Sequence, residues 1–252
     1  MCDVAIVVQA RLTSYRLPKK ILADLGGRPM LAQIVRRCDA VSLAGVSFKT
    51  VIAAPYADVA EILDHVSTTT IAGPEVDVLS RILNVADATG CEKIVRVTGD
   101  CPFVCPRMIE NMVNHAYFTR EEVVANWRIR TFPNGLDLEV YDADWLRKRA
   151  ETTADSDREY FAQGIIQEMP FKSQAVIVNS RDLSRYRLTV DYAEDLELAR
   201  ALYAAMGGEI WDSKMIIDYL DTHPELLRIN AKYARETGSR EENEKRKDGI
   251  KT

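Results

Sequence analysis

Short apolar runs alternate with longer amphipathic stretches through the first half of this chain. The runs at Val4–Val8, Thr50–Ala53 and Lys93–Val97 contain many β-branched residues, which favours buried strands. Apolar residues spaced three or four positions apart predict helices between and after these strands, over Pro29–Cys38, Ala57–His65, Asp77–Thr89 and Pro106–Tyr117. Strands that alternate with helices of this length indicate βαβ units, and therefore an α/β fold with a mainly parallel central sheet.

The pattern changes in the second half of the chain. Strands are predicted at Val123–Asn126 and Leu136–Tyr141, and the loop between them carries Arg128 and Arg130. The remaining expected elements are helices over Asp142–Glu151, Ser156–Met169, Tyr192–Met206 and Ser213–Leu220, and strands at Gln174–Val178 and Tyr186–Val190.

Length and charge narrow the class of protein. The chain has 252 residues, 47% of them hydrophobic, and a net charge of -5, so no overall basic balance favours nucleic-acid binding. Beyond Gly238 the chain is rich in Arg, Glu and Lys, so we expect a disordered charged tail over residues 239–252 and a single domain over residues 1–238. An acidic protein that binds phosphates must gather its positive charge locally.

Cysteine usage and the absence of long apolar runs point to a cytoplasmic protein. No run is long enough to span a membrane, and the short run after Asp3 is not typical of a signal peptide. The five cysteines are odd in number and irregularly spaced, which favours reduced thiols over a disulfide framework. Cys101 and Cys105 form a close pair, but two ligands without a nearby His do not make a zinc site, so buried or loop thiols are expected.

In a parallel α/β sheet the ligand sits beyond the carboxyl ends of the strands, which directs attention to the loops after Val8 and Val97. The first loop, Gln9–Lys20, gathers four cations. Arg11 can clamp phosphate oxygens bidentately, and Lys20 can supply a point charge. No glycine-rich phosphate cradle is present, so this loop alone favours a phosphate site no more than a solvated basic loop.

Two aspartates at predicted strand ends are candidate metal ligands. Asp100 follows the strand at Lys93–Val97, where a carboxylate can hold Mg²⁺ against nucleotide phosphates, although a simple Gly-Asp turn is the alternative. Asp191 follows the strand at Tyr186–Val190. Asp191 and Glu194 together resemble a capping box for the next helix, and a second metal ligand is the alternative.

A fourth segment combines a turn with alternating acidic residues. Asn134-Gly135 is typical of a turn. Asp137 and Glu139 alternate with apolar residues, so both acids face one side of a strand. That side is either a solvent face or a surface that binds sugar hydroxyls beside Arg130.

Taken in order, these motifs resemble the cytidylyltransferase family that activates acidic sugars. The family includes CMP-Kdo synthetase, acylneuraminate cytidylyltransferase and, with the closest resemblance, the spore-coat polysaccharide type. The signature Gln-Ala-Arg-x-x-Ser-x-Arg-Leu-Pro-x-Lys is met from Gln9 to Lys20. Further segments are similar in the same order, at Gly73–Arg81, Val95–Pro102, Pro133–Val140 and Thr189–Asp191, so the resemblance covers roughly residues 4–205.

The resemblance implies a Rossmann-like, GT-A-like nucleotidyltransferase fold and a homodimer. It also implies an inserted sugar-binding and dimerisation region at about residues 123–180, and a Mg²⁺ ion shared by Asp100 and Asp191. Arg11 and Lys20 would be catalytic. The implied nucleotide-binding residues are Gln9, Ala10, Arg11, Ser14, Lys20, Asp77 and Arg81, and the sugar-binding residues are Arg130, Asn134, Asp137 and Glu139.

The expected reaction is transfer of CMP from CTP to an acidic sugar, such as a nonulosonic or octulosonic acid, with release of pyrophosphate for surface polysaccharide or glycan biosynthesis. The expected partners are CTP and a small sugar, with no nucleic acid and no membrane. A related nucleotidyltransferase or glycosyltransferase with another acceptor stays open, as does a non-catalytic nucleotide- or sugar-binding module. Thr13 and Lys19 motivate that module, because both stand where the family usually has Gly. A further departure is Tyr160, which replaces a usual His.

Overall fold

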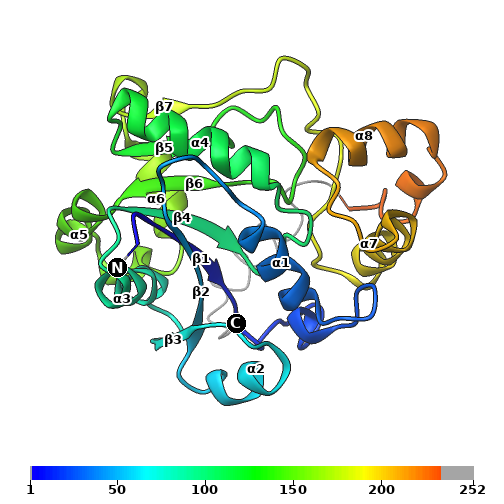
Figure 1. Ribbon diagram of the computed structural model, residues 1–252, viewed down its shortest axis with the longest axis horizontal. Coiled ribbons are helices and arrows are strands. Elements are labelled where there is room, and N and C mark those ends of the chain that lie inside the picture. Colours follow the sequence, from blue (N-terminus) through cyan, green and yellow to red (C-terminus); the bar gives the residue numbers. More distant parts are fainter. Residues whose placement is uncertain (1, 234–252) are drawn as a thin grey trace.

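The computed structural model describes residues 2–233 and contains one seven-stranded sheet in the order β3-β2-β1-β4-β6-β5-β7. Figure 1 shows the strands in this order from bottom to top. The parallel part comprises β1 (Val4–Gln9), β2 (Phe48–Pro55), β3 (Thr70–Gly73) and β4 (Lys93–Thr98). The remaining strands are β6 (Glu139–Asp142), antiparallel to β4, β5 (Val123–Ala125), antiparallel to β6, and β7 (Ala175–Val176), parallel to β5. The predicted α/β fold with a mainly parallel sheet is confirmed.

Helices cover both faces of this sheet. One face packs against α1 (Met30–Asp39), α2 (Val59–His65), α4 (Pro106–Thr119), α7 (Ala193–Met206) and α8 (Ser213–Thr222). The other packs against α3 (Val78–Thr89), α5 (Ala143–Thr152) and α6 (Phe161–Glu168). Successive residues of β1 point to opposite faces, so Val4, Ile6 and Val8 join the first core and Ala5 and Val7 the second. This burial on both faces explains why β1 is a continuous apolar run.

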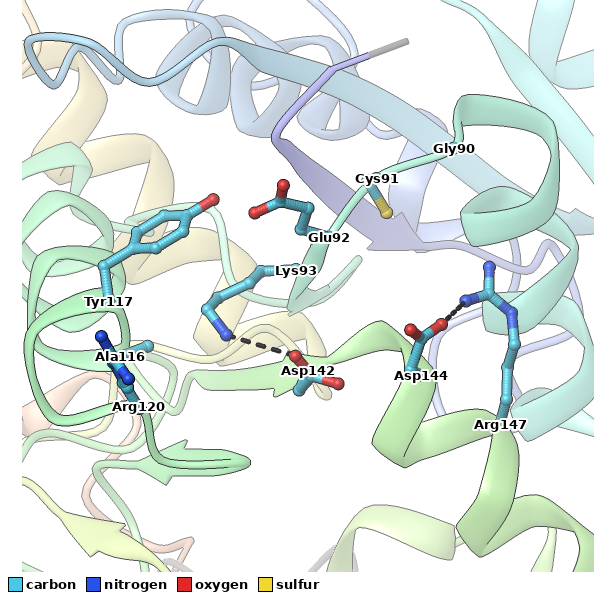
Figure 2. Close-up of a pocket in the computed structure, with 10 residues that line it drawn as sticks. All are labelled: Gly90, Cys91, Glu92, Lys93, Ala116, Tyr117, Arg120, Asp142, Asp144 and Arg147. Carbon is cyan, nitrogen blue, oxygen red and sulfur yellow. Dashed lines mark hydrogen bonds and ion pairs between the residues drawn. The ribbon is translucent and has the colours of Figure 1, made fainter.

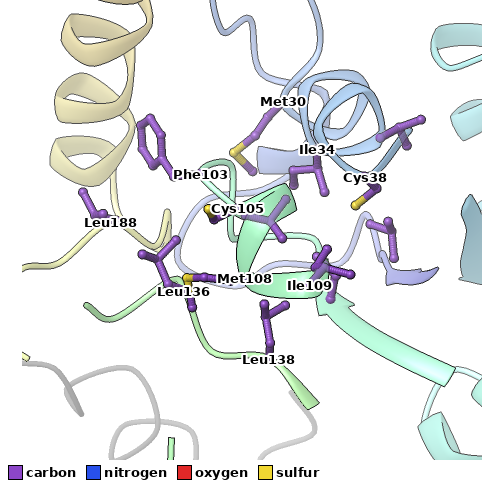
Figure 3. Packing of buried hydrophobic residues seen from close by; sticks show 14 of the residues in the cluster. Met30, Ile34, Cys38, Phe103, Cys105, Met108, Ile109, Leu136, Leu138 and Leu188 are labelled. Carbon is purple, nitrogen blue, oxygen red and sulfur yellow. The ribbon is translucent and has the colours of Figure 1, made fainter. Parts of the chain in front are cut away.

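The first core reaches from α1 to the loops that follow β4. Met30, Ile34 and Cys38 of α1 face Phe103, Cys105, Met108 and Ile109, with Leu136, Leu138 and Leu188 beside them (Figure 3). All five cysteines are buried and free, which confirms their reading as structural thiols. The packing fixes the chain on both sides of Asp100 and so positions the end of β4.

The predicted strand at Tyr186–Val190 is wrong. All five residues of this segment are buried, but only Arg187 forms a bridge, to Asn134. Its backbone hydrogen bonds instead go to a loop and a turn: Leu188 N–H donates to Asn134 O at 2.7 Å, and Val190 N–H donates to Asp100 O at 2.8 Å. The sequence pattern therefore predicted the burial of this segment correctly, but not its pairing in a sheet.

Other boundaries also differ from the prediction. The predicted strand at Leu136–Tyr141 pairs only from Glu139. Before Glu139, the side chain of Asn126 donates to Leu136 O and accepts from Leu138 N–H, so these backbone groups pair with a side chain and not with a strand. The helix predicted over Ser156–Met169 begins at Phe161, and the strand predicted at Gln174–Val178 is only Ala175–Val176. β3 was not predicted. The expected tail at residues 239–252 lies outside the described residues.

Within residues 2–233, no helix combines the length and the apolar composition needed to cross a membrane.

Candidate active site

A cleft opens at the carboxyl ends of β1 and β4, where two adjoining cavities of about 200 and 240 Å³ share part of their lining. The shared residues are Gln9, Arg11, Arg16, Arg96, Thr98, Asp100 and Asp191. We call the smaller cavity the loop half, because Thr13, Ser14 and Lys20 of the first loop line it. We call the other the insert half, because residues between Trp127 and Gln163 line it.

The ammonium of Lys20 lies between the two predicted metal aspartates. Its Nζ is 3.0 Å from Asp191 Oδ1 and 3.4 Å from Asp100 Oδ2, and it donates to Val190 O at 2.8 Å. Burial lowers the pKa of Lys20, but the charges of Asp100 and Asp191 outweigh burial, so this pKa lies above its ordinary value. Lys20 therefore stays protonated in a site largely withdrawn from water.

Asp191 is surrounded by positive charge. Arg16 Nη2 donates to its Oδ1 at 2.8 Å, and Arg187 Nη2 donates to its Oδ2 at 3.3 Å. Burial raises the pKa of Asp191, but Lys20 and then Arg16 lower it, and the net pKa lies far below the ordinary value. The carboxylate is therefore ionised at neutral pH. Arg16 had no predicted role beyond its place in the basic loop, and its position beside Asp191 depends on how that loop folds.

Asp191 is not the helix cap that its sequence context suggested. Tyr192 is the N-cap residue, and Asp195 is the acidic partner of the capping box: its Oδ2 accepts the backbone N–H groups of Asp191 and Tyr192 at 3.0 and 3.1 Å. Glu194 instead pairs with Lys232 at the surface. The helix begins after Tyr192, one position later than the predicted capping box requires, so the acid three residues after the cap is Asp195.

Asp100 and Asp191, the predicted metal ligands, both line the cleft and have the chemistry to hold Mg²⁺. The two aspartates lie on separate segments of the chain that are joined by hydrogen bonds. The backbone carbonyl of Asp100 accepts from Val190 N–H and from Thr189 Oγ1. Mg²⁺ commonly uses one or two carboxylates together with phosphate oxygens and water. Among residues 2–233, no cluster of three or more metal-ligating side chains occurs. The pair fits Mg²⁺ that is bound together with a nucleotide.

Two glycines permit the close contacts behind these aspartates. Gly99 N–H donates to Gln9 O at 2.8 Å, and a Cβ at Gly99 would lie 2.9 Å from the same oxygen. Gly135 has a φ of +96°, and a Cβ there would lie 2.4 Å from Thr189 N. Side chains at these positions would push apart the strand ends and the segment that carries Asp191.

A buried ion pair forms the floor of the insert half. Arg96 of β4 and Glu139 of β6 are direct cross-strand partners, and Arg96 Nη1 donates to both carboxylate oxygens at 3.1 and 3.2 Å. Trp127 Nε1 also donates to Glu139 at 2.5 Å, and Arg96 Nε donates to Gln9 Oε1 at 3.0 Å. Burial raises the pKa of Glu139 against the opposing charge of Arg96. Glu139 is only 3% exposed, so the solvent-face alternative is wrong for this residue.

The other predicted sugar-binding residues line the same half of the cleft. Asn134, Asp137 and Arg130 all contribute to it, and Arg130 Nη1 lies 3.5 Å from Asp137 Oδ2. Arg11 lies between the halves, with Nη1 3.5 Å from Glu159 Oε1. The predicted acceptor residues and the basic loop therefore face one continuous space.

Of the predicted nucleotide-binding residues, Asp77 and Arg81 lie behind the cleft lining. Asp77 caps α3 by accepting from Ser80 N–H at 2.8 Å, and it pairs with Arg158 at 2.7 Å. Arg81 donates through Nη1 to Pro74 O and Glu75 O. Within the described part of the chain its buried Nε and Nη2 have no hydrogen-bond partner. Burial and then Arg11 lower the pKa of Arg81 to about 10.

The two departures from the family signature have local structural explanations. Lys19 adopts a left-handed conformation with a φ of +53°, which is the conformation that favours Gly, and its Nζ pairs with Glu61 at 2.6 Å. The Thr13 hydroxyl donates to Glu75 Oε1 at 2.7 Å. Ala10 is buried, with its N–H donating to Ala53 O at 3.0 Å, and so supports the loop through its backbone. Neither departure places a side chain between Lys20 and the aspartates.

A larger cavity of about 710 Å³ lies at the opposite end of β4 (Figure 2). None of the predicted site residues lines it. Its charged groups include two mutual pairs, Lys93 with Asp142 at 3.5 Å and Arg147 with Asp144 at 2.7 Å. Parallel α/β sheets bind ligands at the carboxyl ends of their strands, and this cavity lies at the amino end of β4. Chemistry and position together favour the smaller cleft.

Known proteins share the fold and part of the sequence of this chain. The chain matches the cytidylyltransferase family model over residues 5–207. It is 30% identical over 217 residues to the spore coat polysaccharide biosynthesis protein SpsF of Bacillus subtilis, covering 82% of this chain and 89% of that protein. It is 35% identical over 119 residues to 3-deoxy-manno-octulosonate cytidylyltransferase of Azorhizobium caulinodans, covering 42% of this chain and 44% of that enzyme. A solved cytidylyltransferase of Leptospira borgpetersenii serovar Hardjo-bovis superposes with a TM-score of 0.82 at 25% identity, covering 90% of this chain and 97% of that chain.

Gly135→Ala is expected to destabilise the protein by about 2 kcal/mol, because the new Cβ meets the backbone of Thr189 at 2.4 Å in addition to the strain of a positive φ. Chemical denaturation measures this loss. Gly45→Ala is the matched control: Gly45 has a φ of +76°, but nothing lies within 4 Å of its added Cβ, so strain alone should cost about 1 kcal/mol. Equal losses in both variants would contradict the close approach at Thr189.

Proposed function

Because this chain belongs to the cytidylyltransferase family, we propose that it transfers CMP from CTP to a sugar acceptor and releases pyrophosphate. The family predicted from the motifs is confirmed, and with it the class of enzyme, a CTP-dependent nucleotidyltransferase. The observation that carries the proposed chemistry is the buried Lys20 ammonium between Asp100 and Asp191. It supplies a fixed positive charge beside two carboxylates, one after the end of β4 and one before the start of α7.

The loop half suits a triphosphate. Arg11, Arg16 and Lys20 line it, and Ser14 adds a hydroxyl near them. Phosphoryl-transfer catalysis is mostly positioning and charge neutralisation, and fixed cations in a poorly solvated site are effective at both. CTP therefore fits with its phosphates towards Lys20.

The insert half suits the acceptor. Arg96 lines both halves, and its Nη2 makes no hydrogen bond to the described residues, whereas Glu139 and Gln9 fix its other nitrogens. Arg96 and Arg130 support an acceptor that carries an acidic group, and Asn134 and Asp137 suit its hydroxyls. An octulosonic or nonulosonic acid has this chemistry. The name of the Azorhizobium relative supports the same substrate class.

The proposed step is a displacement at the α-phosphorus of CTP. An acceptor oxygen forms a bond to that phosphorus, the bond to the oxygen that bridges the α- and β-phosphates breaks, and pyrophosphate leaves with the electron pair. A hydroxyl acceptor releases its proton to solvent. Lys20 and Arg11 stabilise negative charge on the phosphates, and Arg96 orients the acceptor. Mg²⁺ held by Asp100 and Asp191 would supply further charge neutralisation and lower the pKa of an acceptor hydroxyl.

We further propose that residues 123–180 combine acceptor binding with homodimer formation. Three apolar side chains of this region, Ile129, Phe171 and Val178, are exposed by 45%, 59% and 51% and are therefore available for contact with a second copy. The free thiols and the use of CTP support a cytoplasmic location. The name of SpsF supports a role in surface polysaccharide biosynthesis.

Pyrophosphate release with CTP is expected to exceed release with UTP, ATP and GTP when each is offered with nonulosonic acids, octulosonic acids, sugar phosphates and polyol phosphates. The reason is family membership. A coupled pyrophosphate assay measures it. Equal pyrophosphate release with a purine triphosphate would contradict the preference for CTP. Nucleotide binding without pyrophosphate release for any acceptor would favour a non-catalytic module.

Asp100→Asn and Asp191→Asn are each expected to abolish Mg²⁺-dependent turnover, because an amide is a poor substitute for a carboxylate that holds a divalent ion. Circular dichroism should show a native fold in both variants. Asp142→Asn is the control: Asp142 also pairs with a buried lysine, but at the larger cavity, and Asn still caps α5. Near-normal turnover in Asp100→Asn or Asp191→Asn would remove that residue from the proposed metal site.

Lys20→Ala is expected to lower kcat/KM by about 10²–10³, as loss of a donor that stabilises transition-state charge typically does. Lys19→Gly should be nearly neutral for turnover, because Lys19 pairs with Glu61 at the surface and its left-handed backbone suits Gly. Steady-state kinetics on both variants measures these two effects. A damaging Lys19→Gly with a mild Lys20→Ala would show that the loop had been aligned with the family one position out of register.

A further inference from the structure

The chain continues past the family-matched region and returns to the back of the cleft. Residues 226–233 follow α8 and begin with a short 3₁₀ turn at Leu226–Arg228. We call them the C-terminal strap. The strap contacts the segment from Arg187 to Asp195, which carries Asp191, and its residues do not line the cleft.

Asn230 is the buried contact of the strap. It is 4% exposed, and its Nδ2 donates to Asp195 Oδ1 at 2.8 Å and to Arg187 O at 3.2 Å. One side-chain amide thus holds both the carboxylate and the backbone of the segment. A donor this buried contributes most when its acceptor is charged, as Asp195 is.

Asp195 and Arg187 transmit this contact to Asp191. The side chain of Asp195 is fully buried, and Arg187 donates to its two oxygens at 2.8 Å through Nε and Nη2. Asp195 Oδ2 also accepts the N–H of Asp191, and Arg187 Nη2 reaches Asp191 Oδ2 at 3.3 Å. The network therefore holds the backbone N–H and Oδ2 of Asp191, whereas Oδ1 of Asp191 faces Lys20.

Tyr233 makes the second contact of the strap. Its ring stacks on Tyr192, the residue after Asp191, with centroids 3.8 Å apart and planes 8° apart. Its hydroxyl donates to Glu194 Oε2 at 2.9 Å. The ring therefore holds the first residue of the turn into α7, while the surface pair of Lys232 with Glu194 adds little.

We propose that the C-terminal strap is a positioning element that holds the carboxylate of Asp191 in place through Asn230 and Tyr233. Loss of Asn230 leaves a charged, buried Asp195 short of a donor, so its bond to the backbone of Asp191 loosens. A small displacement of a reacting group can lower a rate strongly. The consequence for turnover rests on the proposed function, whereas the effect on Asp191 does not.

Amide hydrogen exchange at Asp191 and Tyr192, followed by NMR without nucleotide, tests the positioning directly. Both N–H groups donate to Asp195, so Asn230→Ala and the isosteric Asn230→Asp should each speed their exchange about tenfold or more relative to wild type. Gln174→Ala is the matched control, because Gln174 is also 4% exposed and donates to two carbonyl groups, those of Ile166 and Met169. It should leave exchange at Asp191 unchanged.

Unchanged exchange at Asp191 in Asn230→Ala, or the same increase in Gln174→Ala, would overturn the proposal. If Asn230→Ala does not fold, Tyr233→Leu decides, and it should speed exchange at Tyr192 severalfold because the stack is lost.

Kinetics with CTP and the acceptor found by the screen supplies the second readout. Asn230→Ala should lower kcat at least tenfold with KM for CTP within about twofold, because Lys20 and Arg11 are untouched. Asn230→Asp should not rescue kcat. A loss of kcat/KM that came only from a rise in KM would overturn the positioning role. If the wild-type protein does not turn over CTP, the proposed function fails, while exchange at Asp191 still decides the role of the strap.

Discussion

A buried ammonium held between two carboxylates is the constraint on which the cleft depends. Lys20 is withdrawn from water, and a desolvated charge is stable only when it is paired and hydrogen-bonded. Asp100 and Asp191 supply the pairs, and Val190 O supplies a further acceptor. These groups come from three distant parts of the chain. The fold must therefore bring the first loop, the end of β4 and the start of α7 together before the charges become favourable.

The parallel sheet makes that meeting possible. β1 and β4 are neighbours in register, so Gln9 lies beside Thr98 and the loops that follow both strands leave the sheet at the same edge. Gly99 and Gly135 let backbone approach backbone at this edge, and Asp100 O ties the segment of Asp191 to the end of β4. A methyl group added at either glycine would push these backbone segments apart and so displace the carboxylates of Asp100 and Asp191.

Several positive charges gather at this edge although the protein is acidic overall. Arg16 and Arg187 crowd Asp191 together with Lys20, and Arg81 and Arg96 lie near Arg11. Burial lowers the pKa of Arg81 most, and repulsion from Arg11 lowers it further. The arrangement is stable only because carboxylates and carbonyl groups pair most of these cations. A polyanion entering the cleft would relieve the remaining repulsion, which links the electrostatics of the fold to the binding of a triphosphate.

Residues with strong local patterns were predictable from the sequence, and residues defined by distant pairing were not. The run at Val4–Val8 is buried on both faces and was predicted as a strand, and the loops after it and after Val97 do line the cleft. The pairing of Arg96 with Glu139 was not predictable, because it requires β6 to join β4 in antiparallel register. The capping role of Asp195 depends on a helix boundary one residue later than the pattern suggested. The left-handed backbone of Lys19 was indicated only by the Gly that the family usually has at this position, because Lys itself rarely adopts it.

A crystal structure of the protein with CTP and Mn²⁺ tests the central claim most directly. The claim is that Lys20, Asp100 and Asp191 form the site of the triphosphate and its metal ion. The account predicts nucleotide density in the loop half with its phosphates against Lys20 and Arg11, and an anomalous Mn²⁺ peak within ligand distance of Asp100 and Asp191. Nucleotide bound in the cavity beside Lys93, or a Mn²⁺ peak remote from both aspartates, would contradict it.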